Sequence, residues 1–167
     1  AMKAAVDGGA EIVVCAGFMQ EPALARIAAE NPEVKFVFVD GWNFGAENVT
    51  AIIFQEEQAG YLAGYAAVKL GYTKLGYCGG MAVPAVLRFG YGFLQGADAA
   101  AAETGADVSV VWGYANQFYG DADITAVMDT WYASGTEVVF ACGGGIYTSA
   151  AEAAKKVGGK VIGVDTD

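Results

Sequence analysis

Short apolar runs alternate along this chain with longer stretches in which apolar residues recur every third or fourth position. The short runs are rich in Val, Ile and Phe, which is typical of buried strands, whereas the longer spacing is typical of helices. Strands are predicted at residues 12–16, 35–40, 49–54, 75–78, 108–113, 138–142 and 160–165. Helices are predicted at residues 2–9, 22–30, 56–70, 84–103, 124–133 and 147–157. This alternation predicts an α/β fold with parallel sheets flanked by helices.

The chain is interpreted as parts of two lobes that divide near Gly71. After Gly71 a complete strand unit bearing Gly79-Gly80 starts afresh, so residues 1–70 are assigned to an N-terminal lobe and residues 71–167 to a C-terminal lobe. Each lobe then has its own sheet. The chain starts within a helix and stops just past a strand, so both lobes are expected to be incomplete and the chain to be a central fragment. A single domain is the alternative.

Charge and composition argue against several functions. The chain has 19 acidic and 9 basic residues, no His, and a formal net charge of -10. An acidic chain without a basic cluster is a poor candidate for binding nucleic acid or an anionic membrane. The lack of His removes the commonest general base and metal ligand, which argues against an enzyme. The three cysteines, Cys15, Cys78 and Cys142, show no CxxC spacing, so they are expected to be buried thiols. Neither a bound metal nor a cofactor is expected.

The stretch from Val138 to Asp165 has the clearest features of a ligand site. A strand leads into Gly143, Gly144 and Gly145, a helix follows, and a second strand is predicted to end at Asp165. Parallel strands joined by a crossover helix end at one sheet edge, which is where open α/β sheets bind ligands. Glycines let a ligand approach backbone N–H groups, and a carboxylate accepts hydrogen bonds from paired sugar hydroxyls. The stretch predicts a site for a small polar molecule, such as one containing a ribose.

Two other interpretations of these glycines stay open. Gly143, Gly145 and Thr148 imitate a dinucleotide fingerprint with Asp165 twenty residues beyond Gly145, although Thr stands where the third glycine is expected. The second alternative is a turn with a purely structural role.

Five blocks of sequence together resemble a known family. They are NVTAIIFQEEQAGYLAG at residues 48–64, GGMAVP at 79–84, RFGYGF at 88–93, GGG at 143–145 and VIGVDTD at 161–167. In this order and spacing the chain resembles the basic membrane protein family, the purine-nucleoside-binding lipoproteins that serve ABC importers. The resemblance covers essentially the whole chain. It implies the type I periplasmic-binding fold, with two Rossmann-like lobes.

The resemblance also implies a function and ligand contacts. It implies a non-enzymatic solute-binding protein that captures a purine nucleoside (adenosine, guanosine or inosine class) in an interlobe cleft and delivers it to an ABC permease. Phe118 would stack on the purine, the loop of Gly143, Gly144 and Gly145 would contact the ligand, and Asp165 would bind the ribose. The implied location is extracytoplasmic, in the periplasm or at the cell surface, with a lipid anchor in the full-length parent.

Two further candidates come from the residue pattern. Phe18 and Met19 follow a strand and Gly17, so they are expected to line the N-terminal side of the cleft, with core packing as the alternative. Phe118 has a similar alternative, as a loop aromatic that caps the core.

The rival functions are a sugar-binding receptor or repressor effector core of the same fold and, from another class, a Rossmann-type oxidoreductase.

Overall fold

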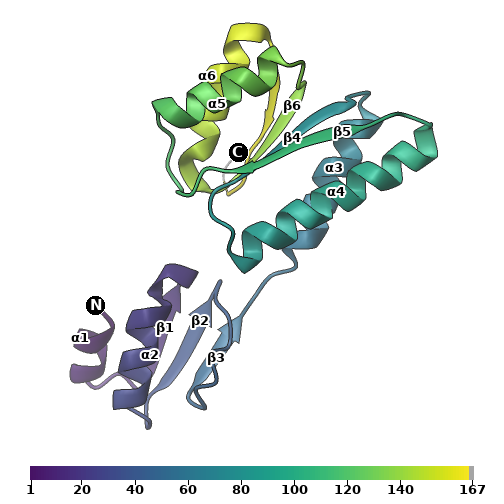
Figure 1. Ribbon diagram of the computed structural model, residues 1–167. Coiled ribbons are helices and arrows are strands. Elements are labelled where there is room, and N and C mark those ends of the chain that lie inside the picture. Colours follow the sequence, from purple (N-terminus) through teal and green to yellow (C-terminus); the bar gives the residue numbers. More distant parts are fainter. Residues whose placement is uncertain (166–167) are drawn as a thin grey trace. The chain divides into compact units, whose positions relative to one another are not determined.

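The computed structural model describes residues 1–165, so Thr166 and Asp167 of the last family-like block lie outside the described residues. The chain divides into two compact units, which comprise Ala1–Phe54 and Gln55–Asp167 (Figure 1). Each unit is built on a parallel sheet of its own, with strand order β1-β2-β3 in the first and β5-β4-β6-β7 in the second. Within residues 1–165, no helix is both long and apolar enough to cross a membrane.

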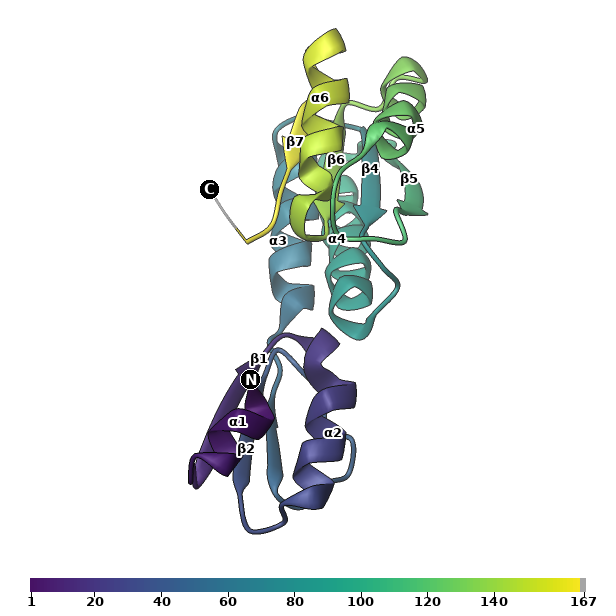
Figure 2. The same cartoon turned by 90° about the vertical axis from the view of Figure 1, so that its left-hand side faces the viewer.

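The first unit packs helices on one face of its sheet. Its elements are α1 (Met2–Asp7), β1 (Ile12–Ala16), the 3-10 helix η1 (Phe18–Gln20), α2 (Glu21–Glu30), β2 (Lys35–Val39) and β3 (Val49–Ile52). The ribbon of α2 runs alongside the strands of this sheet (Figure 2). Leu24 and Ile27 of α2 are buried in a core with Phe36 and Phe38 of β2. On the opposite face, Val14 remains 66% exposed. The described residues therefore cover one face of a sheet type that is normally covered on both.

The second unit has three layers. Its elements are α3 (Glu56–Lys69), β4 (Lys74–Gly79), α4 (Pro84–Thr104), β5 (Ser109–Tyr114), α5 (Ala122–Ala133), β6 (Val138–Cys142), the 3-10 helix η2 (Gly144–Ile146), α6 (Tyr147–Val157) and β7 (Lys160–Ile162). Helices α3 and α4 pack on one face of the sheet, and α5 and α6 pack on the other (Figure 1). All strand pairs are parallel, so the loops that follow β4, β5 and β6 lie at the same edge.

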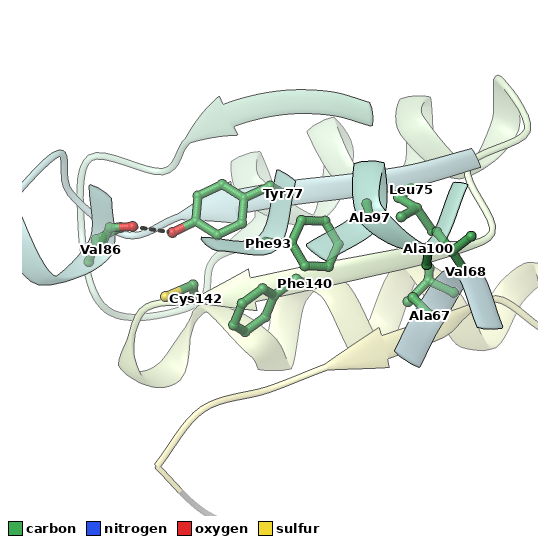
Figure 3. Close-up of a cluster of buried hydrophobic side chains, with 11 residues drawn as sticks. Ala67, Val68, Leu75, Tyr77, Val86, Phe93, Ala97, Ala100, Phe140 and Cys142 are labelled. Carbon is green, nitrogen blue, oxygen red and sulfur yellow. Dashed lines mark hydrogen bonds between the residues drawn. The ribbon is translucent and has the colours of Figure 1, made fainter. Parts of the chain in front are cut away.

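Tyr77 of β4 is the centre of the core between the sheet and the α3–α4 pair. Its ring stacks on Trp112 with 4.3 Å between ring centroids and meets Phe140 edge-on at 5.6 Å. The Tyr77 hydroxyl donates a hydrogen bond of 2.5 Å to the backbone carbonyl of Val86 in α4 (Figure 3). A buried phenol needs such a partner because an unmade hydrogen bond is costly in the interior. This bond therefore fixes the first turn of α4 on the sheet.

Helices α3 and α4 cross with their backbones in direct contact. A Cβ atom on Gly64 would overlap the carbonyl oxygen of Phe93, and one on Gly96 would overlap that of Tyr61. Gly60 and Gly92 repeat this arrangement one turn earlier. Glycine at these four positions allows the close approach of the two backbones. At the start of the pair, the buried Glu56 accepts a 2.5 Å hydrogen bond from Arg88 Nε.

The observed division differs from the predicted one at α3. The two separate sheets agree with the sequence, but the compact units divide between Phe54 and Gln55 rather than at residue 70. The reason is the glycine face of α3, which packs on the backbone of α4 in the second unit. The turn at Gly71 therefore joins two elements of one unit.

Three strands end earlier than predicted. β2 and β3 stop at Val39 and Ile52, and β7 stops at Ile162. Asp40, directly after β2, adopts a positive φ of 55°, which interrupts the extended backbone there, and Asp165 adopts one of 73°. Asp165 consequently lies in a bend beyond β7 and not at the end of the strand.

Candidate functional site

Three loops meet at the carboxyl edge of the second sheet. They follow β4, β5 and β6, and they meet because β4 lies between β5 and β6. The first contains Gly80, the second spans residues 115–121, and the third holds Gly143, Gly144 and Gly145. Ligands of open α/β sheets bind outside this edge.

The ring of Phe118 lies against two glycines from the neighbouring loops. A Cβ atom on Gly80 would stand 2.5 Å from Phe118 Cε1, and one on Gly143 would stand 3.2 Å from Phe118 Cδ1. The Gly143 position would also place a Cβ atom 2.7 Å from the Cα of Gly80. Any side chain at Gly80 would therefore occupy the space of the ring. We call Gly80 and Gly143 the ring seat.

Phe118 is half-buried, so it combines features of its two predicted roles, stacking on the ligand and capping the core. The ring packs against the core cluster that contains Tyr77 and Cys142, as the core alternative expected. The residue as a whole is nevertheless only partly buried, and it lies at the carboxyl edge of the sheet, where open α/β sheets bind ligands. An aromatic ring supported from behind, with part of its surface open, is suited to cover one face of a flat ligand.

The glycine loop has a role that the sequence did not reveal. The N–H of Gly145 donates a 2.8 Å hydrogen bond to the carbonyl of Phe118, and the N–H of Ile146 donates one of 3.2 Å to Gly143. The Gly145 N–H, which was expected to face a ligand, is therefore engaged with the neighbouring loop. A Cβ atom on Gly144 would stand 2.9 Å from the same Phe118 carbonyl oxygen. The glycines let the Phe118 loop lie directly on this backbone.

Asp121 ends the Phe118 loop and caps α5. Its Oδ1 accepts a 2.8 Å hydrogen bond from the N–H of Ile124, and its Oδ2 accepts one of 2.7 Å from Gln117 Nε2. These bonds favour the charged carboxylate and hold the pKa of Asp121 below its ordinary value, with the Ile124 N–H as the main cause. The cap also explains why α5 begins at Ala122, two residues earlier than predicted.

The Asp121 cap predicts a loss of stability in acid. Because its folded pKa lies below the ordinary value of 3.8, its stabilising effect is complete above that value and is lost as the pH falls through the folded pKa. Asp121→Asn still caps the helix but does not titrate. Between about pH 5 and about pH 3, the melting temperature of the native protein should therefore fall further than that of Asp121→Asn. Asp98→Asn, an exposed change within α4, should follow the native curve; an identical acid response of Asp121→Asn would contradict the prediction.

Asp165 lies beyond the end of β7, which is the neighbour of β6 in the second sheet. The Cys142 thiol is buried, which raises its pKa to about 12, and the negative charge of Asp165 contributes in the same direction. Because β7 runs parallel to β6, Asp165 lies at the same edge of the sheet as the glycine loop. Asp165 itself is exposed, so its oxygens are accessible at this edge. The structure thus brings Phe118, the glycine loop and Asp165 to one edge of one sheet.

Phe18 and Met19 belong to the first unit. They form η1 directly after β1, at the carboxyl edge of the first sheet. The Phe18 ring stacks on Trp42 with 6.1 Å between centroids and an interplanar angle of 23°, while Met19 is 74% exposed. Met19 is therefore not a core residue. Trp42, in the loop just beyond β2, joins these candidates through its contact with Phe18.

Comparison with known proteins gives a consistent result. The model of the Bmp family, described as ABC transporter substrate-binding protein PnrA-like, matches residues 1–167. The chain is 33% identical, over 95% of its length and 47% of the relative's, to the ABC transporter nucleoside-binding protein BmpA of Lactococcus lactis. It is 32% identical to basic membrane protein B of Borreliella burgdorferi, with 95% of this chain and 48% of that protein covered. The chain spans about half the length of these relatives.

A solved structure is similar in fold. An ABC transporter solute-binding protein from Aeropyrum pernix superposes with a TM-score of 0.78 and 24% identity, over 93% of this chain and 45% of that chain. This similarity supports the predicted type I periplasmic-binding fold.

Proposed function

Since this chain belongs to the PnrA-like family of ABC transporter substrate-binding proteins, we propose that it carries half of the binding site for a purine nucleoside. In the full-length protein the nucleoside would be captured in an interlobe cleft and delivered to an ABC permease without chemical change. The observation that supports this most is a combination at one sheet edge: Phe118, a partly buried residue whose ring lies on Gly80 and Gly143, and Asp165, an exposed acidic residue.

The two groups match the two halves of a nucleoside. A purine base offers a flat π-face, which an aromatic ring covers with exclusion of water. The ribose offers adjacent hydroxyls, and an ionised carboxylate accepts hydrogen bonds from both. The name of the Lactococcus lactis relative, which is described as nucleoside-binding, favours the same ligand class.

Further parts of the proposal concern the full-length protein. Phe18 and Met19 are proposed as additional ligand contacts from the first unit, with Trp42 supporting Phe18 by stacking. The full-length protein is proposed to be extracytoplasmic, at the cell surface or in the periplasm, and held there by a lipid anchor. Its proposed role is capture and release, with no catalytic residue.

Asp165→Ala tests the proposal. In the full-length protein it should weaken adenosine and guanosine binding by about tenfold or more, because each charge-assisted hydrogen bond to a sugar hydroxyl contributes about 1.5–3 kcal/mol. Binding of free adenine should change far less, since the base carries no ribose. Isothermal titration calorimetry measures both affinities.

Asp107→Ala is the matched control, because Asp107 is exposed and precedes β5 at the opposite edge of the sheet. It should leave all affinities unchanged. If Asp165→Ala binds adenosine as tightly as the native protein, the ribose assignment is wrong. If the native protein binds ribose or glucose but no nucleoside, a sugar receptor replaces the proposed function.

A further inference from the structure

Ser149 joins the Phe118 loop to the first turn of α6. The side chain is buried, with 3% of its surface exposed. Its Oγ accepts a 2.9 Å hydrogen bond from the N–H of Asp121 and donates one of 2.9 Å to the carbonyl of the same residue. A hydroxyl has one proton to donate and lone pairs to accept with, so both bonds can exist together. One side chain therefore holds both backbone groups of the residue that ends the loop.

Other residues of the segment 145–149 also contact the Phe118 loop. A Cβ atom on Gly120 would stand 2.8 Å from Ser149 Oγ and would overlap Thr148 Oγ1. The carbonyl of Phe118 accepts its hydrogen bond from Gly145, at the other end of the glycine loop. The loop is thus fixed at residues 118, 120 and 121 by the segment 145–149, which lies some 28 residues further along the chain.

We propose that Ser149 is a positioning residue for ligand binding, acting through Phe118. By fixing Asp121, it keeps the loop against the glycine segment and the Phe118 ring on the ring seat before the ligand arrives. A ring that is already ordered avoids the ordering cost that a mobile one would incur on binding. This inference rests on the proposed function, because it assigns Phe118 the role of covering the base.

The test measures the coupling between Ser149 and Phe118. In the full-length protein, Ser149→Ala should weaken adenosine binding by roughly three- to tenfold, the effect of losing one or two neutral hydrogen bonds. In a Phe118→Ala background the same change should have almost no effect, because the ring that it positions is absent. A residue that only stabilises the fold would reduce affinity by the same factor in both backgrounds.

A matched control and a second route complete the experiment. Ser134→Ala removes a 2.7 Å hydrogen bond from a serine hydroxyl to the Trp131 carbonyl at the far end of α5, and should leave adenosine affinity unchanged. Gly120→Ala displaces the loop from Thr148 and Ser149 without altering Ser149, so it should reproduce the weakening and the coupling even if Ser149→Ala does not fold.

The outcomes separate the two proposals. If Phe118→Ala itself leaves adenosine binding unchanged, the stacking role in the proposed function is overturned. If Phe118→Ala weakens binding while Ser149→Ala and Gly120→Ala have equal effects with and without the ring, the site stands and the positioning role of Ser149 is overturned.

Discussion

Phe118→Ala is expected to weaken the binding of adenosine to the full-length protein by about one to two orders of magnitude. Stacking of a base on an aromatic side chain contributes about 1–3 kcal/mol, and each 1.4 kcal/mol corresponds to a tenfold change in affinity. Phe118→Trp should retain most of the affinity, because the π-face survives. Titration calorimetry with adenosine and guanosine measures the change.

Tyr119→Ala provides the control for this experiment. Tyr119 is the adjacent residue of the same loop and is 65% exposed, so its ring is available without being seated on Gly80 and Gly143. Its removal should leave affinity within about twofold, as expected of surface changes. An equal loss in both variants would mean that the loop as a whole, and not the seated ring, determines binding.

Gly64→Ala is expected to lower the free energy of unfolding by about 2 kcal/mol. Alanine is favoured over glycine in a helix by about 1 kcal/mol, but an added atom in a packed interior costs about 1–3 kcal/mol or more. The overpacking should prevail here, because the added Cβ atom meets the carbonyl of Phe93 and the Ala97 nitrogen, which are backbone atoms and cannot rotate away. Urea denaturation of the full-length protein, followed by circular dichroism, measures the loss.

Ala66→Leu is the matched change for Gly64→Ala. Ala66 lies on the exposed side of the same helix, so a larger side chain there meets solvent and should alter stability by less than about 0.5 kcal/mol. The reciprocal variant Gly96→Ala should behave like Gly64→Ala, because its Cβ atom would meet the Tyr61 backbone. Wild-type stability of Gly64→Ala would show that the two helices separate readily, contrary to the observed contact.

The strand and helix pattern of the fold could be predicted from local sequence. The strand Val138–Cys142 and the helix Tyr147–Val157 have their predicted bounds, because an apolar run and a three-to-four spacing are local properties. The unit to which α3 belongs could not be predicted. Nothing in the local sequence of α3 identifies its packing neighbour as α4, which starts 15 residues after α3 ends at Lys69.

The candidate site was predictable only in part for a similar reason. Phe118 came from a resemblance, whereas the glycine loop and Asp165 were also predicted from their positions after strands. The contact of Gly80 with Phe118 joins residues 38 apart in the chain, and the hydrogen bonds of Ser149 with Asp121 join residues 28 apart. Neither Gly80 nor Ser149 stands out in its own neighbourhood. A serine in the first turn of a helix is common, so its contact with Asp121 becomes visible only in the folded chain.

The backbone contact between α3 and α4 has a consequence for natural variation. Any single-base change in a glycine codon that alters the amino acid introduces a residue with a Cβ atom. At Gly60, Gly64, Gly92 and Gly96 every such residue places that atom against the backbone of the other helix. Even alanine, the smallest replacement, therefore meets the other helix at these positions. A second substitution in that helix cannot relieve the contact, because the atoms that are met belong to its backbone. In a saturation library selected for folding, these four codons should therefore be depleted of every non-synonymous change, alanine least, while the exposed Ala66 accepts most residues.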